Sequence, residues 1–161
     1  MKYDPHNHAG QLQGLVARLE SNEYGICKEN RKLLLAYHRE LIGEGYTASR
    51  ICKHLYILKM IVKAVKKPLE LLTKEEIKDY VVQVESNPNF SEWSKHDYKV
   101  VIRCFYRWLR KTGEALPEEV SWIRIHVKER HKLPEDLLTE EEVNRMVSAT
   151  SIPRDRALIQ C

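Results

Sequence analysis

Five basic residues recur at every fourth position in the middle of the sequence, and this row is its strongest candidate for chemistry. They are Lys95, Lys99, Arg103, Arg107 and Lys111. Residues four apart lie on the same side of an α-helix, so the five cations would form one row. Like charges at this spacing destabilise an isolated helix by roughly a few tenths of a kcal/mol per pair. The row therefore predicts an anionic partner, and nucleic-acid phosphates are the simplest one.

A second basic segment strengthens this prediction. Residues 47–67 contain Arg50 and Lys53 near the start, four further lysines and no acidic residue. Two basic helices in one small bundle can clamp phosphates, and hydroxyl groups at the start of a helix add hydrogen-bond donors. The predicted contacts to duplex DNA are Thr47, Ser49, Arg50, Lys53, Lys95, Lys99 and Arg103, with Arg124, Lys128 and Arg130 on the DNA backbone.

Simpler interpretations of the same residues stay open at this point. The row on residues 95–111 is also compatible with a solvated helix face whose acidic partners come from neighbouring helices. Thr47 is equally a plain helix N-cap. The cations at 124, 128 and 130 are equally those of a linker kept soluble by charge. Only the positions of nearby carboxylates can separate these alternatives.

Other chemistry has little support in the sequence. His6 and His8 lack nearby carboxylate or cysteine partners, so we expect no metal site there. Phosphate-binding glycine loops, dinucleotide turns and nucleophile elbows do not occur. We therefore expect no cofactor.

Composition limits the class of protein. The chain has 161 residues and a mass of 19.0 kDa, with 43% hydrophobic and 31% charged residues and a net charge of +4. These values are typical of a globular protein. The four cysteines lie far apart, and no apolar run is long enough for a membrane span. We expect a cytoplasmic protein with reduced thiols and no membrane partner.

The apolar periodicity predicts an all-α fold. Its expected helices cover about 9–19, 28–43, 47–67, 74–85 and 91–111, then a short helix after Thr139 and another from Ala157. We interpret 1–27 as an N-terminal extension, 28–113 as a bundle of four core helices, 114–134 as a linker and 135–161 as the start of a second domain. Within the linker, residues 123–127 alternate apolar and polar, which predicts an extended segment. Leu58, Phe105 and Trp108 are predicted core residues.

Three segments resemble the tyrosine recombinase (phage integrase) family. Residues 41–47 read Leu-Ile-Gly-Glu-Gly-Tyr-Thr, and residues 98–109 follow the pattern Tyr-x-x-Val-Ile-x-x-Phe-Tyr-Arg-Trp-Leu. The more specific match is the tail, with Leu-Pro at 133–134, Leu-Leu-Thr-Glu-Glu-Glu-Val at 137–143 and Arg-Asp-Arg-Ala-Leu-Ile at 154–159. Together the matches cover about residues 28–161.

The resemblance implies a SAM-like core-binding domain, built as a four-helix bundle, followed by the beginning of a catalytic domain. In that family a tyrosine nucleophile, two arginines, a lysine and histidines exchange DNA strands. The sequence contains no His-x-x-Arg, and its nearest match, His96-x-x-Lys99, lies in the helical bundle. We therefore expect a duplex-DNA-binding module of an integrase-like recombinase, concerned with DNA integration and recombination, that is not itself an enzyme and has no small-molecule substrate. Other recombinase protomers are expected partners.

Two other functions remain as alternatives. The chain could be a helical adaptor for acidic protein partners, or the front half of a split active recombinase. If residues 135–161 are only the start of a domain, the apolar residues Val143, Met146, Leu158 and Ile159 would lack partners. We therefore expect the tail to be mobile or to dimerise.

Overall fold

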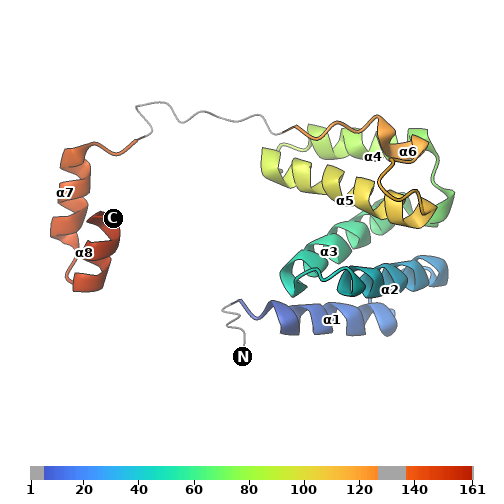
Figure 1. Cartoon of the computed structure of the whole chain (residues 1–161), viewed down its shortest axis with the longest axis horizontal. Coiled ribbons are helices and arrows are strands. Elements are labelled where there is room, and N and C mark those ends of the chain that lie inside the picture. The colour runs from blue at the N-terminus through green and yellow to red at the C-terminus, as the bar shows by residue number, and fades with distance from the viewer. Residues whose placement is uncertain (1–5, 127–136, 161) are drawn as a thin grey trace. The chain divides into compact units, whose positions relative to one another are not determined.

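The computed structural model describes residues 6–126 and 137–160, and these residues form an all-α fold, as predicted (Figure 1). Contacts divide the chain into two units, Met1–Val127 and Lys128–Cys161. The first unit contains α1 (His8–Glu20), α2 (Lys28–Gly43), α3 (Ala48–Val65), a 3-10 turn η1 (Leu69–Leu71), α4 (Lys74–Ser86), α5 (Glu92–Arg110) and α6 (Glu118–Ser121). In the part of the chain that the structure describes, no helix has both the length and the apolar character that crossing a membrane requires.

Side-chain caps set the starts of the main helices of the bundle. The Thr47 side chain accepts a hydrogen bond from the Arg50 backbone N–H and begins α3. Thr73 and Glu76 form the predicted reciprocal capping box at the start of α4, and Ser91 caps α5. Each cap satisfies a backbone donor that has no partner within its own helix. These caps therefore fix the residue at which each helix begins. The starting residue in turn determines which side chains of the helix point outward.

The core lies between α2, α3, α4 and α5. Leu34, Leu55, Leu58 and Phe105 are each 1% exposed or less. Leu58 and Phe105 confirm the predicted core, whereas Trp108 is half-buried and lines a cavity at the edge of the bundle. Burial of these apolar side chains is the main stabilising contribution of the fold.

The N-terminal helix α1 is part of this bundle. It packs mainly against α3, and its Leu19 is fully buried. Residues 1–27 were predicted to form an N-terminal extension. The contact between α1 and α3 places this helix in the first unit.

The first part of the expected linker also packs against the bundle. The four-residue helix α6 was not predicted, and its Val120 is fully buried. Residues 123–126 have no regular secondary structure: Ile123 is buried and Arg124 is exposed, in line with the alternating pattern. The first unit therefore extends to residue 127. Residues 127–134 of the expected linker lie outside the described residues.

The second unit is a pair of short helices, α7 (Glu140–Ala149) and α8 (Pro153–Gln160). The predicted capping box of Thr139 and Glu142 is present at the start of α7. No residue of α7 is buried, and Met146 and Leu158 are 44% and 71% exposed. The unit therefore leaves much of its apolar surface uncovered. That this tail is mobile or dimerises stays a prediction.

Candidate nucleic-acid interface

The first turn of α3 presents several groups suited to an anion. Ser49 and Arg50 are exposed there, next to the Thr47 cap. Thr47 satisfies only one backbone N–H of this turn, the one of Arg50, at 3.4 Å. The other free N–H groups and the helix dipole favour negative charge at this end. The Arg50 guanidinium lies 4.4 Å from the centre of the Tyr46 ring, which holds the side chain in place.

Three arginines from two helices lie around the Cys104 thiol. Arg50 comes from α3, and Arg103 and Arg107 come from successive turns of α5. Burial raises the pKa of Cys104; the charges of Arg107, Arg50 and Arg103 oppose that rise, and the charge of Glu44 adds to it. No ion pair to a carboxylate is formed by any of the three within residues 6–126. We call Arg50, Arg103 and Arg107 the arginine cluster.

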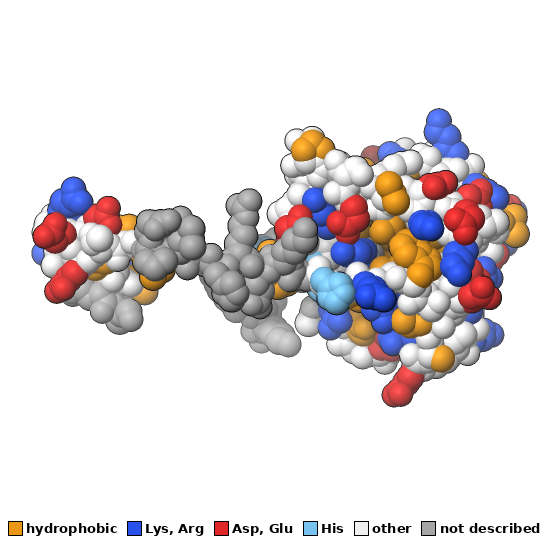
Figure 2. Space-filling view, turned by 90° about the horizontal axis from the view of Figure 1, so that it is seen from above, with side chains coloured by type: hydrophobic (Ala, Val, Ile, Leu, Met, Phe, Trp, Pro, Cys, Tyr) orange, Lys and Arg blue, Asp and Glu red, His pale blue; other side chains and the backbone are white. Residues whose placement is uncertain are grey.

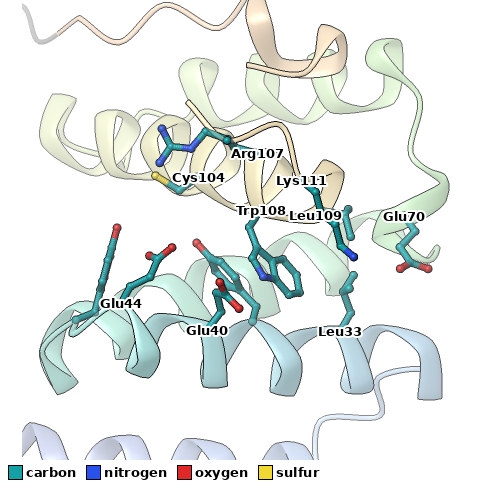
Figure 3. Close-up of a pocket in the computed structure, with 12 residues that line it drawn as sticks. Leu33, Glu40, Glu44, Glu70, Cys104, Arg107, Trp108, Leu109 and Lys111 are labelled. Atoms are coloured by element: carbon teal, nitrogen blue, oxygen red, sulfur yellow. The ribbon is translucent and has the colours of Figure 1, made fainter. Parts of the chain in front are cut away.

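A cavity of about 600 Å³ borders the arginine cluster (Figure 3). Cys104 and Arg107 lie on its α5 side, and Glu40 and Glu44 lie on its α2 side. The Trp108 ring points from α5 into the space between them. The cavity thus has one basic and one acidic wall, so it offers no uniform attraction for a polyanion.

Three of the predicted DNA-contacting lysines are neutralised by carboxylates of the same unit. Lys53 pairs with Asp97 at 2.9 Å, Lys95 with Glu92 at 3.1 Å and Lys99 with Glu85 at 2.7 Å. The side chains of Lys95 and Lys99 are only 14% and 12% exposed. The expectation of an unpaired row is therefore wrong for this end of α5. Acidic residues from α4 and from α5 itself balance these lysines, as the simpler interpretation requires.

The remaining predicted contacts lie in different surroundings. Arg103 donates a long hydrogen bond of 3.5 Å to the carbonyl of Ile123, which ties α5 to the segment after α6. Arg124 is exposed one residue further along. Lys128 and Arg130 lie outside the described residues. On the face that Figure 2 displays, basic and acidic side chains are interspersed around an apolar strip rather than forming one continuous basic area.

Two residues of this surface were missed in the sequence. Arg107 belongs to the row but was not chosen as a contact, and Tyr46 was considered only as part of the segment 41–47 that resembles the recombinase family. The signal for both was present: Tyr46 precedes Arg50 by four residues, and Arg107 follows Arg103 by four. What the sequence could not supply was the packing of α3 on α5 that joins the two pairs.

Comparisons with protein-family models, with curated proteins and with solved structures found no match for this chain. The similarity to tyrosine recombinases therefore stays a prediction that rests on the three sequence segments. Of the fold, the all-α class is shown by the described helices.

Proposed function

We propose that the first unit binds duplex DNA through its phosphates. The observation that carries the proposal is the arginine cluster, in which three cations from α3 and α5 surround the Cys104 thiol and outnumber Glu44, the carboxylate that also acts on it. None of the three forms an ion pair with a carboxylate in the described part of the unit. A set of unneutralised cations is electrostatically unfavourable until an anion joins it. Phosphate is the anion for which arginine is best suited, because its planar fork donates two parallel hydrogen bonds.

The width of the cluster suits a nucleic-acid strand. Packed helices have axes about 8–10 Å apart, and B-DNA carries a phosphate about every 3.4 Å of its axis on each strand. Arginines on two neighbouring helices therefore reach about three phosphates of one strand. Thr47 and Ser49, at the start of α3, can add hydroxyl donors to the same contact.

The sequence resemblance supports the same proposal and makes it more specific. As the core-binding part of an integrase-like recombinase, this unit would hold one side of the duplex and leave strand cleavage to other groups. The proposal assigns no catalytic step to this chain. Lys95 and Lys99 take no part in it, because each is already paired and mostly buried.

The test is a binding titration of the full chain with a labelled duplex of mixed sequence, followed by fluorescence anisotropy. Replacing Arg50, Arg103 and Arg107 together by Gln should weaken binding by more than about tenfold at low salt, because three phosphate contacts are lost. A matched control replaces Lys28, Lys32 and Arg39 by Gln. These three are exposed on α2, and their loss changes the net charge equally.

The control separates specific contacts from general attraction. The proposal fails if the two triple variants lose equal affinity, because net charge alone would then explain binding. It also fails if the wild type binds an acidic peptide as tightly as the duplex, which is the result expected of an adaptor for acidic proteins. Circular dichroism melting of each variant shows that the helices remain folded.

A further inference from the structure

A second cation site lies away from the arginine cluster, where Lys59 of α3 stands between two tyrosine rings. The Lys59 ammonium is 4.7 Å from the centre of the Tyr24 ring and 4.3 Å from that of Tyr56. Lys63, one turn further along α3, lies 5.4 Å from the same Tyr24 ring. Tyr24 belongs to the turn after α1, so the site exists only because α1 packs on α3.

The two lysines of this site have no carboxylate partner. Among the residues that the structure describes, neither Lys59 nor Lys63 forms an ion pair with a carboxylate. Burial lowers the pKa of Lys59, and the charges of Lys63 and Arg18 lower it further. A cation that is partly desolvated and surrounded by cations is stabilised by an anion more than an exposed lysine is. Arg18 is balanced only by a long 4.0 Å contact to Glu23.

The site opens into a groove of about 550 Å³ between α1, α3 and the start of α5. Its lining combines cations, tyrosine rings and small polar groups, among them Arg18, Gln11, Ser49 and Ser94. Among the described residues, Asp97 is the one carboxylate in the lining, and it is already paired with Lys53. Ligand sites of this size hold molecules as large as a nucleotide. Tyr56 is 53% exposed, so part of its ring is accessible to a ligand.

We propose that this groove binds a phosphate group, held by the ammonium of Lys59 with Lys63 and Arg18 beside it, on a ligand whose body lies along the tyrosine rings. The ligand is either a free nucleotide or the terminal phosphate of a nucleic-acid strand, since both present the same chemistry. The site uses none of the three cluster arginines, although Ser49 lines the groove and is also a proposed DNA contact. It requires α1, which the cluster does not.

Calorimetric titration of the full chain with inorganic pyrophosphate tests the site directly. Lys59→Met removes the charge and keeps most of the apolar stem, and it should weaken pyrophosphate binding by at least about tenfold, as loss of a charge-assisted hydrogen bond predicts. The matched control is Lys32→Met, an exposed lysine of α2 that should bind as the wild type does. Lys63→Gln, at an exposed position, gives a second reading if Lys59→Met fails to fold.

Two further titrations distinguish the sources of the phosphate. If adenosine monophosphate binds as tightly as a 5′-phosphorylated single-stranded oligonucleotide, the ligand is a free nucleotide. Tighter binding of the phosphorylated oligonucleotide, lost when its 5′-phosphate is absent, indicates a strand end. The proposal is overturned if pyrophosphate does not bind, or if Lys59→Met and Lys63→Gln both bind it as Lys32→Met does. The arginine-cluster variant should keep pyrophosphate binding, so failure of the duplex interface does not affect this result.

Discussion

The first two and the next two cations of the basic row on α5 carry equal charge but have different surroundings. Near the start of the helix, Lys95 and Lys99 are mostly buried and paired with Glu92 and Glu85. Two turns later, Arg103 and Arg107 are half-buried beside Cys104 and have no carboxylate partner in the described part of the unit. The periodicity is the same in both halves, so periodicity alone does not identify a binding surface.

The difference shows what converts a charged helix face into an interface. A lysine with a carboxylate at 2.7 Å gives up one favourable contact for each phosphate contact that it gains. An arginine without a carboxylate partner has no ion pair to give up, and Arg103 has only a long hydrogen bond to the Ile123 carbonyl. We therefore expect the arginine end, together with Arg50 of α3, to account for most of the binding to phosphate.

The largest expected effect concerns His54, which is buried and lies near both regions. Its Nδ1 is 3.0 Å from the Tyr37 hydroxyl, and burial, followed by the charges of Arg50 and Lys53, lowers its pKa from 6.5 to about 4. Between these values the unfolded chain binds a proton that the folded chain does not. Stability is therefore complete above about pH 6.5 and falls as the pH drops toward 4, by on the order of 3 kcal/mol.

Chemical denaturation at several pH values measures this dependence. The variant His54→Gln should lose the pH dependence of the free energy of unfolding between pH 6.5 and 4. The variant His126→Gln, at an exposed position, should keep this dependence. Arg50→Gln should raise the pKa of His54, which NMR titration of the imidazole detects. An unchanged pKa in Arg50→Gln would show that the arginine cluster lies too far from His54 to influence it.

The next effect compares the two ends of α5 directly. Exchanging Arg103 and Arg107 for Gln should weaken duplex binding by more than about tenfold, because unpaired cations lose phosphate contacts. Exchanging Lys95 and Lys99 for Gln should weaken it by less than about threefold, because their charges are already balanced. Anisotropy titrations of the two double variants at one salt concentration measure both losses of duplex affinity. Equal losses would show that the arginine pair contributes no more to binding than the lysine pair.

A smaller effect should follow from releasing Lys99. Glu85→Gln removes the carboxylate at 2.7 Å and leaves a mostly buried ammonium without its partner. The free energy of unfolding should fall by about 1 kcal/mol, and duplex affinity should rise two- to threefold, roughly, as the lysine becomes available. Glu114→Gln, in an exposed loop position, is the control for the change in net charge. A rise in affinity no larger than that of the control would mean that Lys99 cannot reach DNA even when unpaired.

The smallest effect concerns the support of Arg50. Tyr46→Leu removes the ring under the guanidinium, a contact worth about 0.5–1 kcal/mol at exposed sites. Duplex affinity should fall by about two- to fivefold, and Trp93→Leu, at another exposed aromatic residue, should leave it unchanged. If Tyr46→Leu binds as tightly as the wild type, the ring does not orient Arg50 for binding.

The sequence was sufficient for the helices because their signals are local. The capping boxes at Thr73 and Thr139 and the apolar stripe of α3 predicted elements that the structure confirms. The short helix α6 was missed because four residues make only about one helical turn, so no apolar pattern can repeat within it. The alternation that follows it suggested an extended segment.

The candidate site was harder to predict because its decisive contacts join distant positions. Asp97 is 44 residues from Lys53, and Glu85 is 14 residues from Lys99. Neither pairing follows from the spacing within one helix. The Glu92 and Lys95 pair, three residues apart, is local and could have been predicted. Spacing along α5 identified the cations, whereas the packing of α4 and α3 against it determined which of them remain available.

The salt dependence of duplex binding tests the central claim most directly. Each phosphate contact contributes about 0.9 to the slope of log affinity against log salt concentration. The variant lacking all three cluster arginines should therefore show a slope shallower than the wild type by about 2.7, and the α2 control variant should not. Equal slopes for the wild type and the arginine variant would show that the cluster does not contact phosphate, and the proposed interface would be contradicted.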